Sequence, residues 1–306
     1  MIESQSDTVP HICVCICTFR RARFLRELLE ALARQQTAGA FTYSAVVADN
    51  DALRSAEPVV RDFATASTLE VRYSVEPRQN ISLARNMAVA HADGQYVAFI
   101  DDDEVPEPKW LLHLFSACGR YRVDGVLGPV KPRFDEPPPK WVLAGKFCER
   151  PTYPTGFVID WRKGRTGNVL LKKQVFDGVE QPFRPQFRTG EDQDFFRRMI
   201  AEKGCVFVWC DEAVAYESIP PIRWNRIFML RRALLRGAVS LAHPTMGVGS
   251  VAKSVIAAAT YIAVLPLSFV LGQHAVMTCL VKLFDHAGRL LASVGLNPVK
   301  EPYVTE

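Results

Sequence analysis

The stretch Gln95-Tyr-Val-Ala-Phe-Ile-Asp-Asp-Asp-Glu-Val-Pro106 decides the fold, because it joins a strand-like run to a cluster of acids. Tyr96–Ile100 is apolar, has the length of a strand and follows the turn signal Asp93-Gly94. The four carboxylates of Asp101–Glu104 then need a cation nearby, because like charges repel. Carboxylates on a short turn suit Mg²⁺ or Mn²⁺, and open α/β sheets bind ligands where their strands end. On this stretch alone, a metal–nucleotide site and a solvated acidic turn are both open interpretations.

Length and composition predict a globular protein with a sizeable core. The chain has 306 residues, of which 48% are hydrophobic and 23% charged, and this fits one large domain or a domain with an extension. The net charge of +4 is too small to indicate nucleic-acid binding, so we expect no nucleic-acid partner. Residues 1–10 are polar and lack the pattern of a signal peptide, so we expect the catalytic part to lie in the cytoplasm.

The eight cysteines are expected to be free thiols. Cys13, Cys15 and Cys17 alternate along a strand-like run, so they face one side of it and cannot easily bridge to one another. The sequence has no C-x-x-C motif. We interpret these residues as small buried side chains in a reducing compartment, with a zinc site as the weaker alternative.

Strand-like and helix-like patterns alternate along the N-terminal part of the chain. The expected strands and helices, in order, are 12–18, 21–34, 43–48, 56–66, 69–75, 82–92 and 96–100, with Ser82 as an N-cap. This order predicts an α/β fold with a mostly parallel, doubly wound sheet. Three strands end in polar residues, Thr18, Asp49 and Asp101–Asp103. Because the carboxyl ends of parallel strands share one edge, we expect these residues to gather there.

The middle of the chain is less regular. Strands are expected at 125–130 and 169–171, with a strand pair at 205–210 and 213–216. The Pro-rich stretch 132–154 is interpreted as a loop over the site, or else as a surface linker. Gly190-Glu-Asp192 opens a helix, and its acids either cap that helix through its dipole or include a general base, Asp192.

The C-terminal part is basic and then strongly apolar. Residues 221–240 hold five arginines and no acid, which predicts a basic amphipathic helix that could clamp phosphates or lie on an anionic membrane. Residues 254–281 carry no Lys, Arg, Asp or Glu, and they exceed the roughly 20 residues that a membrane-spanning helix needs. Pro266 is expected to kink this helix or to turn a re-entrant segment. A buried core helix or an oligomer contact is the alternative.

Five motifs occur in the order found in a known enzyme family. They are Thr18-Phe-Arg20, Asp49, Asn80-Ile-Ser-Leu-Ala-Arg85-Asn86, Asp101-Asp-Asp103 and Gly190-Glu-Asp192. Over residues 10–240 the chain resembles the inverting, metal-dependent glycosyltransferases of family 2, which have the GT-A fold. The Asn80 and Asp101 motifs are especially similar to those of bacterial exopolysaccharide glycosyltransferases of the succinoglycan-biosynthesis type. One departure is Asn80 itself, where many relatives carry glycine.

The resemblance implies a role for each matching residue. The nucleotide would be bound by Thr18, Arg20, Asp49, Arg85 and Asp101, with Asp49 on uracil or ribose. Asp103, together with Asp101, would hold Mg²⁺ or Mn²⁺, and Asp192 would be the catalytic base. The basic stretch around Arg231 and Arg232 resembles a segment that contacts the diphosphate in some relatives.

We therefore expect a catalytic domain at 10–240 and a hydrophobic helical, membrane-associating extension at 241–306. The enzyme would transfer a sugar from a UDP-sugar to a glycan or lipid-linked oligosaccharide, at the cytoplasmic face of a bacterial inner membrane, in surface or exopolysaccharide synthesis. Two alternatives stay open. A nucleotidyltransferase should have a glycine-rich loop after its first strand, whereas Thr18–Phe24 holds no glycine. A non-catalytic, membrane-attached scaffold that binds a nucleotide sugar would not need Asp101, Asp103 and Asp192.

Overall fold

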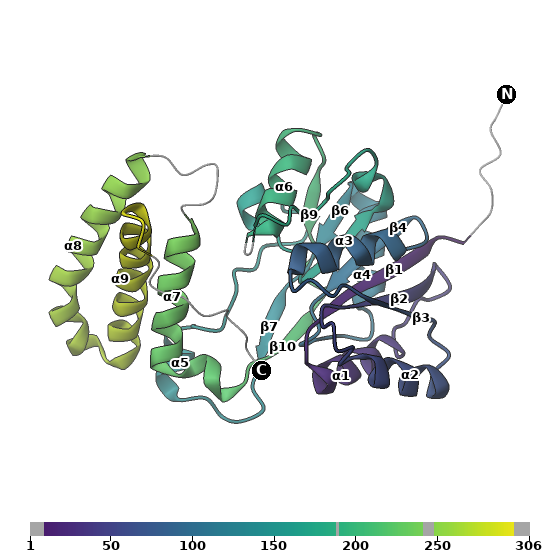
Figure 1. Cartoon of the computed structure of the whole chain (residues 1–306), viewed down its shortest axis with the longest axis horizontal. Coiled ribbons are helices and arrows are strands. Elements are labelled where there is room, and N and C mark those ends of the chain that lie inside the picture. The colour runs from purple at the N-terminus through teal and green to yellow at the C-terminus, as the bar shows by residue number, and fades with distance from the viewer. Residues whose placement is uncertain (1–8, 188–189, 241–247, 297–306) are drawn as a thin grey trace. The chain divides into compact units, whose positions relative to one another are not determined.

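The computed structural model describes residues 9–187, 190–240 and 248–296 (Figure 1). Its strands are β1 (His11–Thr18), β2 (Thr42–Asp49), β3 (Val71–Val75), β4 (Tyr96–Ile100), β5 (Glu104–Pro106), β6 (Gly125–Leu127), β7 (Val130–Arg133), β8 (Asn168–Lys172), β9 (Phe207–Trp209) and β10 (Ala215–Ser218). Its helices are α1 (Ala22–Leu32), α2 (Glu57–Ala66), α3 (Ile81–His91), α4 (Trp110–Tyr121), α5 (Lys140–Ala144), α6 (Glu191–Ala201), α7 (Arg226–Ser240), α8 (Val248–Leu271) and α9 (Gln273–Ser293), with short 3₁₀ helices η1 (Trp161–Lys163), η2 (Lys173–Phe176) and η3 (Pro221–Trp224). Residues 1–8, on which the leader prediction rests, lie outside the described residues.

The larger sheet has the strand order β3-β2-β1-β4-β8-β6-β9. As predicted, β3, β2, β1 and β4 run parallel. β8 runs antiparallel between β4 and β6. The sequence could not show this direction, because an apolar run covered on both faces looks the same in either orientation. The prediction of a mostly parallel α/β sheet is confirmed, and its parallel half carries the polar strand ends.

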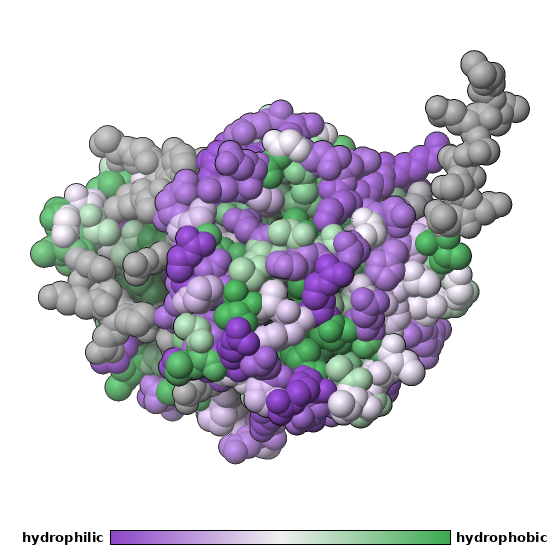
Figure 2. Space-filling model, turned by 45° about the vertical axis from the view of Figure 1, so that its right-hand side comes forward, coloured by the Kyte–Doolittle hydropathy of each residue, from purple (hydrophilic) through white to green (hydrophobic). Residues whose placement is uncertain are grey.

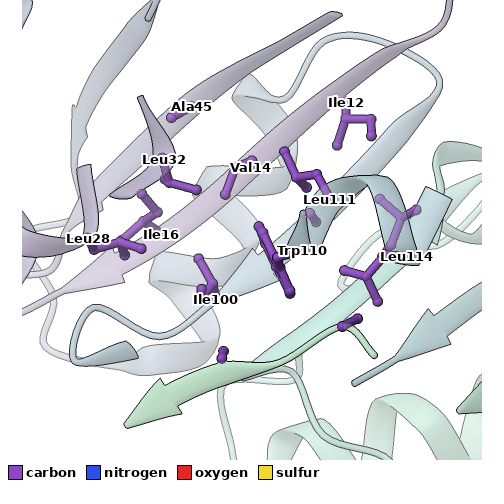
Figure 3. Close-up of a cluster of buried hydrophobic side chains, with 14 of the residues drawn as sticks. Ile12, Val14, Ile16, Leu28, Leu32, Ala45, Ile100, Trp110, Leu111 and Leu114 are labelled. Atoms are coloured by element: carbon purple, nitrogen blue, oxygen red, sulfur yellow. The ribbon is translucent and has the colours of Figure 1, made fainter. Parts of the chain in front are cut away.

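Helices cover both faces of β1, because its side chains alternate between two apolar clusters. The even-numbered residues of Ile12–Ile16 join a cluster with α1 and α4, and Figure 3 shows them with Leu28 and Trp110. The odd-numbered residues, both cysteines, join a second cluster with α3 and α6. Each fully buried leucine or isoleucine contributes about 1.5–3 kcal/mol. The eight cysteines are free thiols, as predicted.

The N-cap of α3 is Asn80, so the prediction of Ser82 is wrong. The Asn80 Oδ1 atom accepts hydrogen bonds from the backbone N–H groups of Ser82 (2.9 Å) and Leu83 (3.4 Å). The Asn80 amide also donates to the carbonyl of Pro185 (2.9 Å), and the Ser82 hydroxyl donates to that of Arg184 (3.1 Å). Both side chains therefore attach the start of α3 to the segment before α6, and a glycine at position 80 could not do this.

Two further strand predictions are wrong. The stretch 125–130 is not one strand, because β6 ends in the larger sheet and β7 begins in a second sheet of order β5-β10-β7. The stretches 205–210 and 213–216 do not pair, because β9 lies beside β6 and β10 pairs with β5. Gly128 lies where the chain changes sheets, and a Cβ there would come within 2.3 Å of the Ala213 carbonyl oxygen. The chain therefore passes from one sheet to the other at a close backbone contact, which the hydrophobic periodicity of the sequence does not predict.

The chain forms two compact units. The first holds the larger sheet and comprises the residues up to Lys131 together with Arg150–Ser218. The second comprises Pro132–Glu149 and Ile219–Thr305, and it holds α5, α7, α8 and α9 among its described elements. The predicted domain boundary at residue 240 and the predicted role of the 132–154 loop stay predictions.

Close helix contacts organise the second unit. α8 and α9 meet at Gly272, where φ is +100°, and Pro266 lies inside α8. The turn therefore occurs at glycine and not at Pro266, because glycine adopts positive φ at no steric cost. α9 packs against both α7 and α8. A Cβ on Gly237 would lie 1.9 Å from the Asp285 carbonyl oxygen, so the backbones of α7 and α9 approach as closely as in small-residue helix pairs.

Candidate functional site

The predicted polar strand ends meet at one edge of the larger sheet. β2, β1 and β4 are neighbours there, and Thr18 lies opposite Asp49 in the register of β1 and β2. The Thr18 hydroxyl donates a hydrogen bond of 2.7 Å to Asp102 Oδ2. This bond connects the end of β1 to Asp101–Glu104, which we call the acid run. The structure thus brings Thr18, Asp49 and the acid run to the edge where they were expected.

The four carboxylates of the acid run have different environments. The Asp101 side chain is 41% exposed, whereas Asp102, Asp103 and Glu104 are buried. Arg21 Nη1 donates to Asp102 Oδ1 (2.9 Å) and to Asp103 Oδ2 (3.2 Å). Burial, and then the charges of Asp102 and Asp101, raise the pKa of Asp103 to about 7. Asp102 therefore anchors the run, and Asp101 is its solvent-facing member.

Arg21, which sequence reasoning missed, is the arginine that pairs with Asp102 and Asp103. Arg20 instead pairs with Asp51 on the loop after β2, with Nε 3.1 Å from Oδ2. Arg20 has a φ of +56°, and this backbone turn sends adjacent side chains to different partners. The pair Arg20-Arg21 was visible in the sequence, but the direction of each side chain was not. The contact of Arg20 with a nucleotide stays a prediction.

Asp49 organises the loop that follows β2. Its side chain is fully buried, and its Oδ2 accepts hydrogen bonds from the Tyr73 hydroxyl and the Ala56 N–H, both at 2.8 Å. Its Oδ1 accepts from the Asp51 N–H at 3.1 Å. In the next position, Asn50 Oδ1 accepts from the Asn80 N–H at 2.8 Å. The loop is therefore fixed at the strand edge, and the contact of Asp49 with uracil or ribose stays a prediction.

Arg85 joins three elements around the site. Its guanidinium pairs with Glu191 at the start of α6 and lies 3.7 Å from Asp101 Oδ1 at the end of β4. The side chain is 9% exposed and lies over the ring of Phe183. Burial lowers the pKa of Arg85, but Glu191 and Asp101 more than offset it, so the net shift is upward. The arginine thus fixes the end of β4 relative to α6.

Asp192 lies beside this pair and keeps an accessible carboxylate. It follows Glu191 in the first turn of α6 and is half-buried. Its Oδ1 accepts the Gln193 N–H at 2.8 Å, and no side chain in the described ranges bonds to it. Burial raises the pKa of Asp192, and Arg85 opposes that shift. A half-buried carboxylate that has one oxygen without a hydrogen-bond partner can act as a general base.

A buried charge network lies behind Asp101. Arg150 Nη2 is 2.6 Å from Glu217 Oε2, and Nη1 is 3.8 Å from Glu104 Oε1. Glu104 is fully buried, and burial, followed by Asp101, raises its pKa well above the ordinary value. Glu104 Oε1 has no hydrogen-bond partner within the part of the chain that the structure describes. Arg150 and Glu217 were missed by sequence reasoning, because each lies in a stretch without a motif.

The acid run fits a divalent ion that substrate phosphates would complete. Mg²⁺ is typically held by one or two carboxylates plus phosphates, with few other protein ligands. In the described residues no group of three or more His, Cys, Asp or Glu is arranged to hold a metal alone. Glu104 Oε1 is buried without a hydrogen-bond partner in the described residues, so a cation close to Asp101 would favour the charged form of this carboxyl. Asp101 and Asp103 are the residues that would hold such an ion.

Known proteins are similar to this chain in sequence or in fold. The family model described as glycosyl transferase family 2 matches residues 13–179. The succinoglycan biosynthesis protein ExoM of Rhizobium meliloti (strain 1021) is 31% identical over 229 residues, which are 74% of this chain and 73% of that protein. The mannosyltransferase PcManGT from Pyrobaculum calidifontis, solved with GDP-Man and Mn²⁺, superimposes with a TM-score of 0.61 at 17% identity, covering 93% and 88% of the two chains. S. aureus TarS 1-349, solved with UDP-GlcNAc, gives 0.54 at 14%, covering 94% and 92%.

The match to the family model and the similarity to ExoM place the chain in glycosyltransferase family 2. Its α/β fold is of the GT-A type, as the solved structures show. The expected resemblance to this family, and to proteins of the succinoglycan-biosynthesis type, is confirmed.

Because Arg85 pairs with Glu191 and Asp101, its removal is expected to lower the free energy of unfolding strongly. Replacing Arg85 by alanine leaves Glu191 buried without its partner, which is expected to cost about 3–5 kcal/mol. The measurement is the urea midpoint of the purified full chain, followed by tryptophan fluorescence. Arg72→Ala is the matched control, because Arg72 pairs with Asp93 on the surface and such pairs contribute about 1 kcal/mol or less. Equal losses in the two variants would contradict the bridging role.

Proposed function

We propose that this chain is an inverting, metal-dependent glycosyltransferase that uses a nucleotide-sugar donor, with a UDP-sugar as the expected donor. One observation carries the proposal: Arg85 holds the solvent-facing Asp101 next to the α6 turn that carries the accessible Asp192. A donor-binding carboxylate and a base thereby lie near one buried cation, the Arg85 guanidinium. The family membership supplies the reaction class.

The carboxylates of the site have separate roles in the proposed reaction. Asp192 takes the proton of an acceptor hydroxyl, and that oxygen attacks the anomeric carbon of the donor. The bond from that carbon to the diphosphate oxygen breaks, and the nucleoside diphosphate leaves with the bond electrons. A metal ion at Asp101 and Asp103 would neutralise the charge that grows on the diphosphate. A single displacement needs one base and inverts the configuration, whereas a retaining double displacement would also need a carboxylate nucleophile.

The donor and acceptor classes are inferred from relatives. The solved structure of TarS holds UDP-GlcNAc and that of PcManGT holds GDP-Man and Mn²⁺, which supports a nucleotide sugar and a divalent ion here. ExoM is named for succinoglycan biosynthesis, which supports a glycan or lipid-linked oligosaccharide acceptor in exopolysaccharide synthesis.

The direct test is a screen of UDP- and GDP-sugars for release of free nucleotide by the purified full chain. We expect one UDP-sugar to be hydrolysed slowly with Mn²⁺ or Mg²⁺, and release to stop when EDTA is added. Release from no sugar nucleotide, with folding verified by circular dichroism, would overturn the proposed function. Release of diphosphate from a nucleoside triphosphate in the presence of a sugar phosphate would instead indicate a nucleotidyltransferase.

We propose that the protein acts at the cytoplasmic face of the bacterial inner membrane, and the helices of the second unit support the membrane attachment. Gly249–Leu271 is long and apolar enough to cross a membrane. The burial pattern of α8 is the reverse of that in a helix on the surface of a soluble protein. Ser254 and Ser268 are buried, whereas Ile256, Leu267 and Val270 are 69%, 67% and 86% exposed. Figure 2 shows hydrophobic residues in green at the left-hand edge, where α8 and α9 lie. An outward apolar face with polar residues inside is expected of a helix in contact with lipid.

The outward face of α8 gives a testable prediction. A triple variant, Ile256→Gln, Leu267→Gln and Val270→Asn, is expected to move the protein from the membrane fraction to the soluble fraction. Each side chain contributes about 1.5–3 kcal/mol when buried in an apolar medium, so the bound-to-free ratio should fall more than about a hundredfold.

The matched control changes exposed apolar residues of the first unit. Leu53, Val158 and Val206 are 78%, 62% and 44% exposed, and a triple variant to Gln, Asn and Asn should stay in the membrane fraction. Fractionation after ultracentrifugation of cell lysates measures both proteins. A wild-type chain found wholly in the soluble fraction would contradict membrane attachment.

A further inference from the structure

The segment Gly164–Gly167 runs between the two parts of the candidate site. At its first residue, a Cβ on Gly164 would lie 2.3 Å from Cγ of Phe196. Phe196 follows Asp192 by one turn of α6, so this end of the segment touches the helix that carries the proposed base. At its last residue, a Cβ on Gly167 would lie 2.9 Å from Glu104 Oε1 and 3.0 Å from Asp101 Oδ2.

The register of β8 fixes this position. Asn168 directly follows the segment and lies opposite Ile100, the residue before Asp101. The Asn168 side chain is buried, accepts a hydrogen bond from the Trp110 indole N–H (2.8 Å) and donates to the carbonyls of Pro129 (3.0 Å) and Ala213 (2.8 Å). The segment therefore cannot shift along the strand without breaking these buried bonds, each of which is costly to leave unmade.

Arg165 is the charged side chain of this segment. Three other arginines at the site each have a carboxylate partner: Arg21 pairs with Asp102, Arg85 with Glu191 and Arg150 with Glu217. Arg165 is exposed and makes no ion pair or hydrogen bond through its guanidinium with any residue that the structure describes. An arginine held at a site by its backbone, with its five donors unused, is available to a ligand.

The surroundings of Arg165 favour an anion. The positive charge of Arg150 and the negative charge of Asp192 both act on the Arg165 guanidinium. Arg165 remains a cation at neutral pH, because arginine does not lose its proton in proteins. A cation close to a second cation is stabilised by an anion that binds near both guanidinium groups. Asp192 does not pair with it in the described residues.

We propose that Arg165 binds a phosphate group of a substrate at the candidate site. The inference rests on the proposed function, which supplies the phosphate chemistry. The planar guanidinium matches phosphate oxygens with two parallel hydrogen bonds, which a lysine cannot reproduce. Such a phosphate has two possible sources: the diphosphate of the nucleotide-sugar donor, or the phosphate that links a lipid acceptor to its glycan.

The test compares Arg165→Ala and Arg165→Lys with the matched control Arg162→Ala. Arg162 lies three residues earlier in η1, where it bonds to Asp160 and covers the ring of Trp161. Calorimetry on the full chain measures UDP binding with Mn²⁺ in one arm. In the other arm, farnesyl diphosphate is titrated into protein already saturated with UDP and Mn²⁺.

We expect Arg165→Ala to weaken one of these two ligands by at least about tenfold, as the loss of charged hydrogen bonds implies. Arg165→Lys should recover part of the loss, and Arg162→Ala should bind like the wild type. Weakened UDP would identify the donor diphosphate as the source, and weakened farnesyl diphosphate alone would identify the acceptor phosphate.

Three results would overturn the inference, and they are distinguishable. If the wild type binds UDP but Arg165→Ala binds both ligands unchanged, or if Arg162→Ala loses as much affinity as Arg165→Ala, Arg165 does not bind phosphate and the proposed function still stands. If the wild type binds no UDP with Mn²⁺ and releases none from any UDP-sugar, the proposed function fails and the inference fails with it. A thermal midpoint equal to that of the wild type shows that each variant is folded.

Discussion

Replacing Asp192 by asparagine is expected to lower the rate of sugar transfer by about 10²- to 10⁴-fold, the usual contribution of a positioned general base. Asparagine has the same shape, and its Oδ1 can still accept the Gln193 N–H, so the fold should be unchanged. It cannot take a proton from the acceptor. The measurement is the initial rate of nucleotide release from the UDP-sugar found in the screen, with the acceptor present.

Asp194 is the control on the same helix. Its carboxylate is fully buried and accepts a hydrogen bond from Arg198 Nε at 2.9 Å. Asp194→Asn should therefore lower the unfolding free energy by about 3–5 kcal/mol, yet leave the rate at low temperature close to that of the wild type. Asp192→Asn should show the reverse pattern. A normal rate in Asp192→Asn would remove Asp192 from the role of base.

The pH dependence of the rate gives an independent test of the same residue. Burial raises the pKa of Asp192, and a base acts only when it is deprotonated. Activity should therefore be present above the raised pKa and fall as the pH drops through it, at a higher pH than the ordinary aspartate value of about 3.9 would give. With Mn²⁺ kept saturating so that Asp103 stays ionised, the residual activity of Asp192→Asn should lack this acidic limb in a plot of kcat/KM against pH.

Replacing Asp103 by asparagine is expected to reduce metal-dependent UDP affinity and to lower the transfer rate at least about a hundredfold. A bound divalent ion supplies several kcal/mol of charge stabilisation, and each 1.36 kcal/mol is a factor of ten in rate. Arg21 holds the wild-type carboxylate at 3.2 Å, and the amide oxygen can replace it there. Calorimetry with UDP, with and without Mn²⁺, separates loss of the ion from loss of the fold.

Asp93 is the matched control for this prediction. It lies in the turn before β4, at the opposite end of the strand from the acid run, and pairs with Arg72 on the surface. Asp93→Asn should keep both the Mn²⁺ dependence and the rate. UDP affinity that rises with Mn²⁺ in Asp103→Asn as it does in the wild type would show that Asp103 is not a ligand.

The position of the site was predictable from the sequence because it follows from strand direction. Thr18, Asp49 and Asp101 each end an apolar run, and parallel strands place such ends at one edge. The same rule could not show what each carboxylate does once it is there. Asp49, at the end of β2, accepts a hydrogen bond from the Tyr73 hydroxyl, and Asp102 accepts one from Thr18; both partners come from other strands.

The pairing of the residues that join the parts of the site could not be predicted from the sequence. Arg85 and Glu191 each lie in a recognised motif, but they are 106 positions apart, and a single sequence carries no record of which residues pair. Arg150 and Glu217, which are 67 positions apart, lie outside any motif and resemble surface residues. The antiparallel direction of β8 is what places Gly167 against Asp101, and nothing in an apolar run of strand length specifies direction.

Local backbone geometry accounts for the remaining differences. The N-cap of α3 is Asn80 and not the predicted Ser82, because the buried Ser82 hydroxyl donates to the Arg184 carbonyl. Gly128 separates two sheets and Gly272 separates two helices, each where the chain passes too close to a neighbour or has positive φ. A glycine in a sequence indicates that an element can end there, but it does not indicate whether the chain changes sheet or turns between two helices.

A crystal structure of the full chain with UDP and Mn²⁺, with anomalous data at the manganese edge, tests the central claim most directly. We predict one manganese peak in contact with the Asp103 carboxylate and the UDP diphosphate, at the edge formed by β2, β1 and β4, with Asp192 facing the open side of the diphosphate. Manganese bound away from the acid run, or UDP bound at another part of the molecule, would contradict the account.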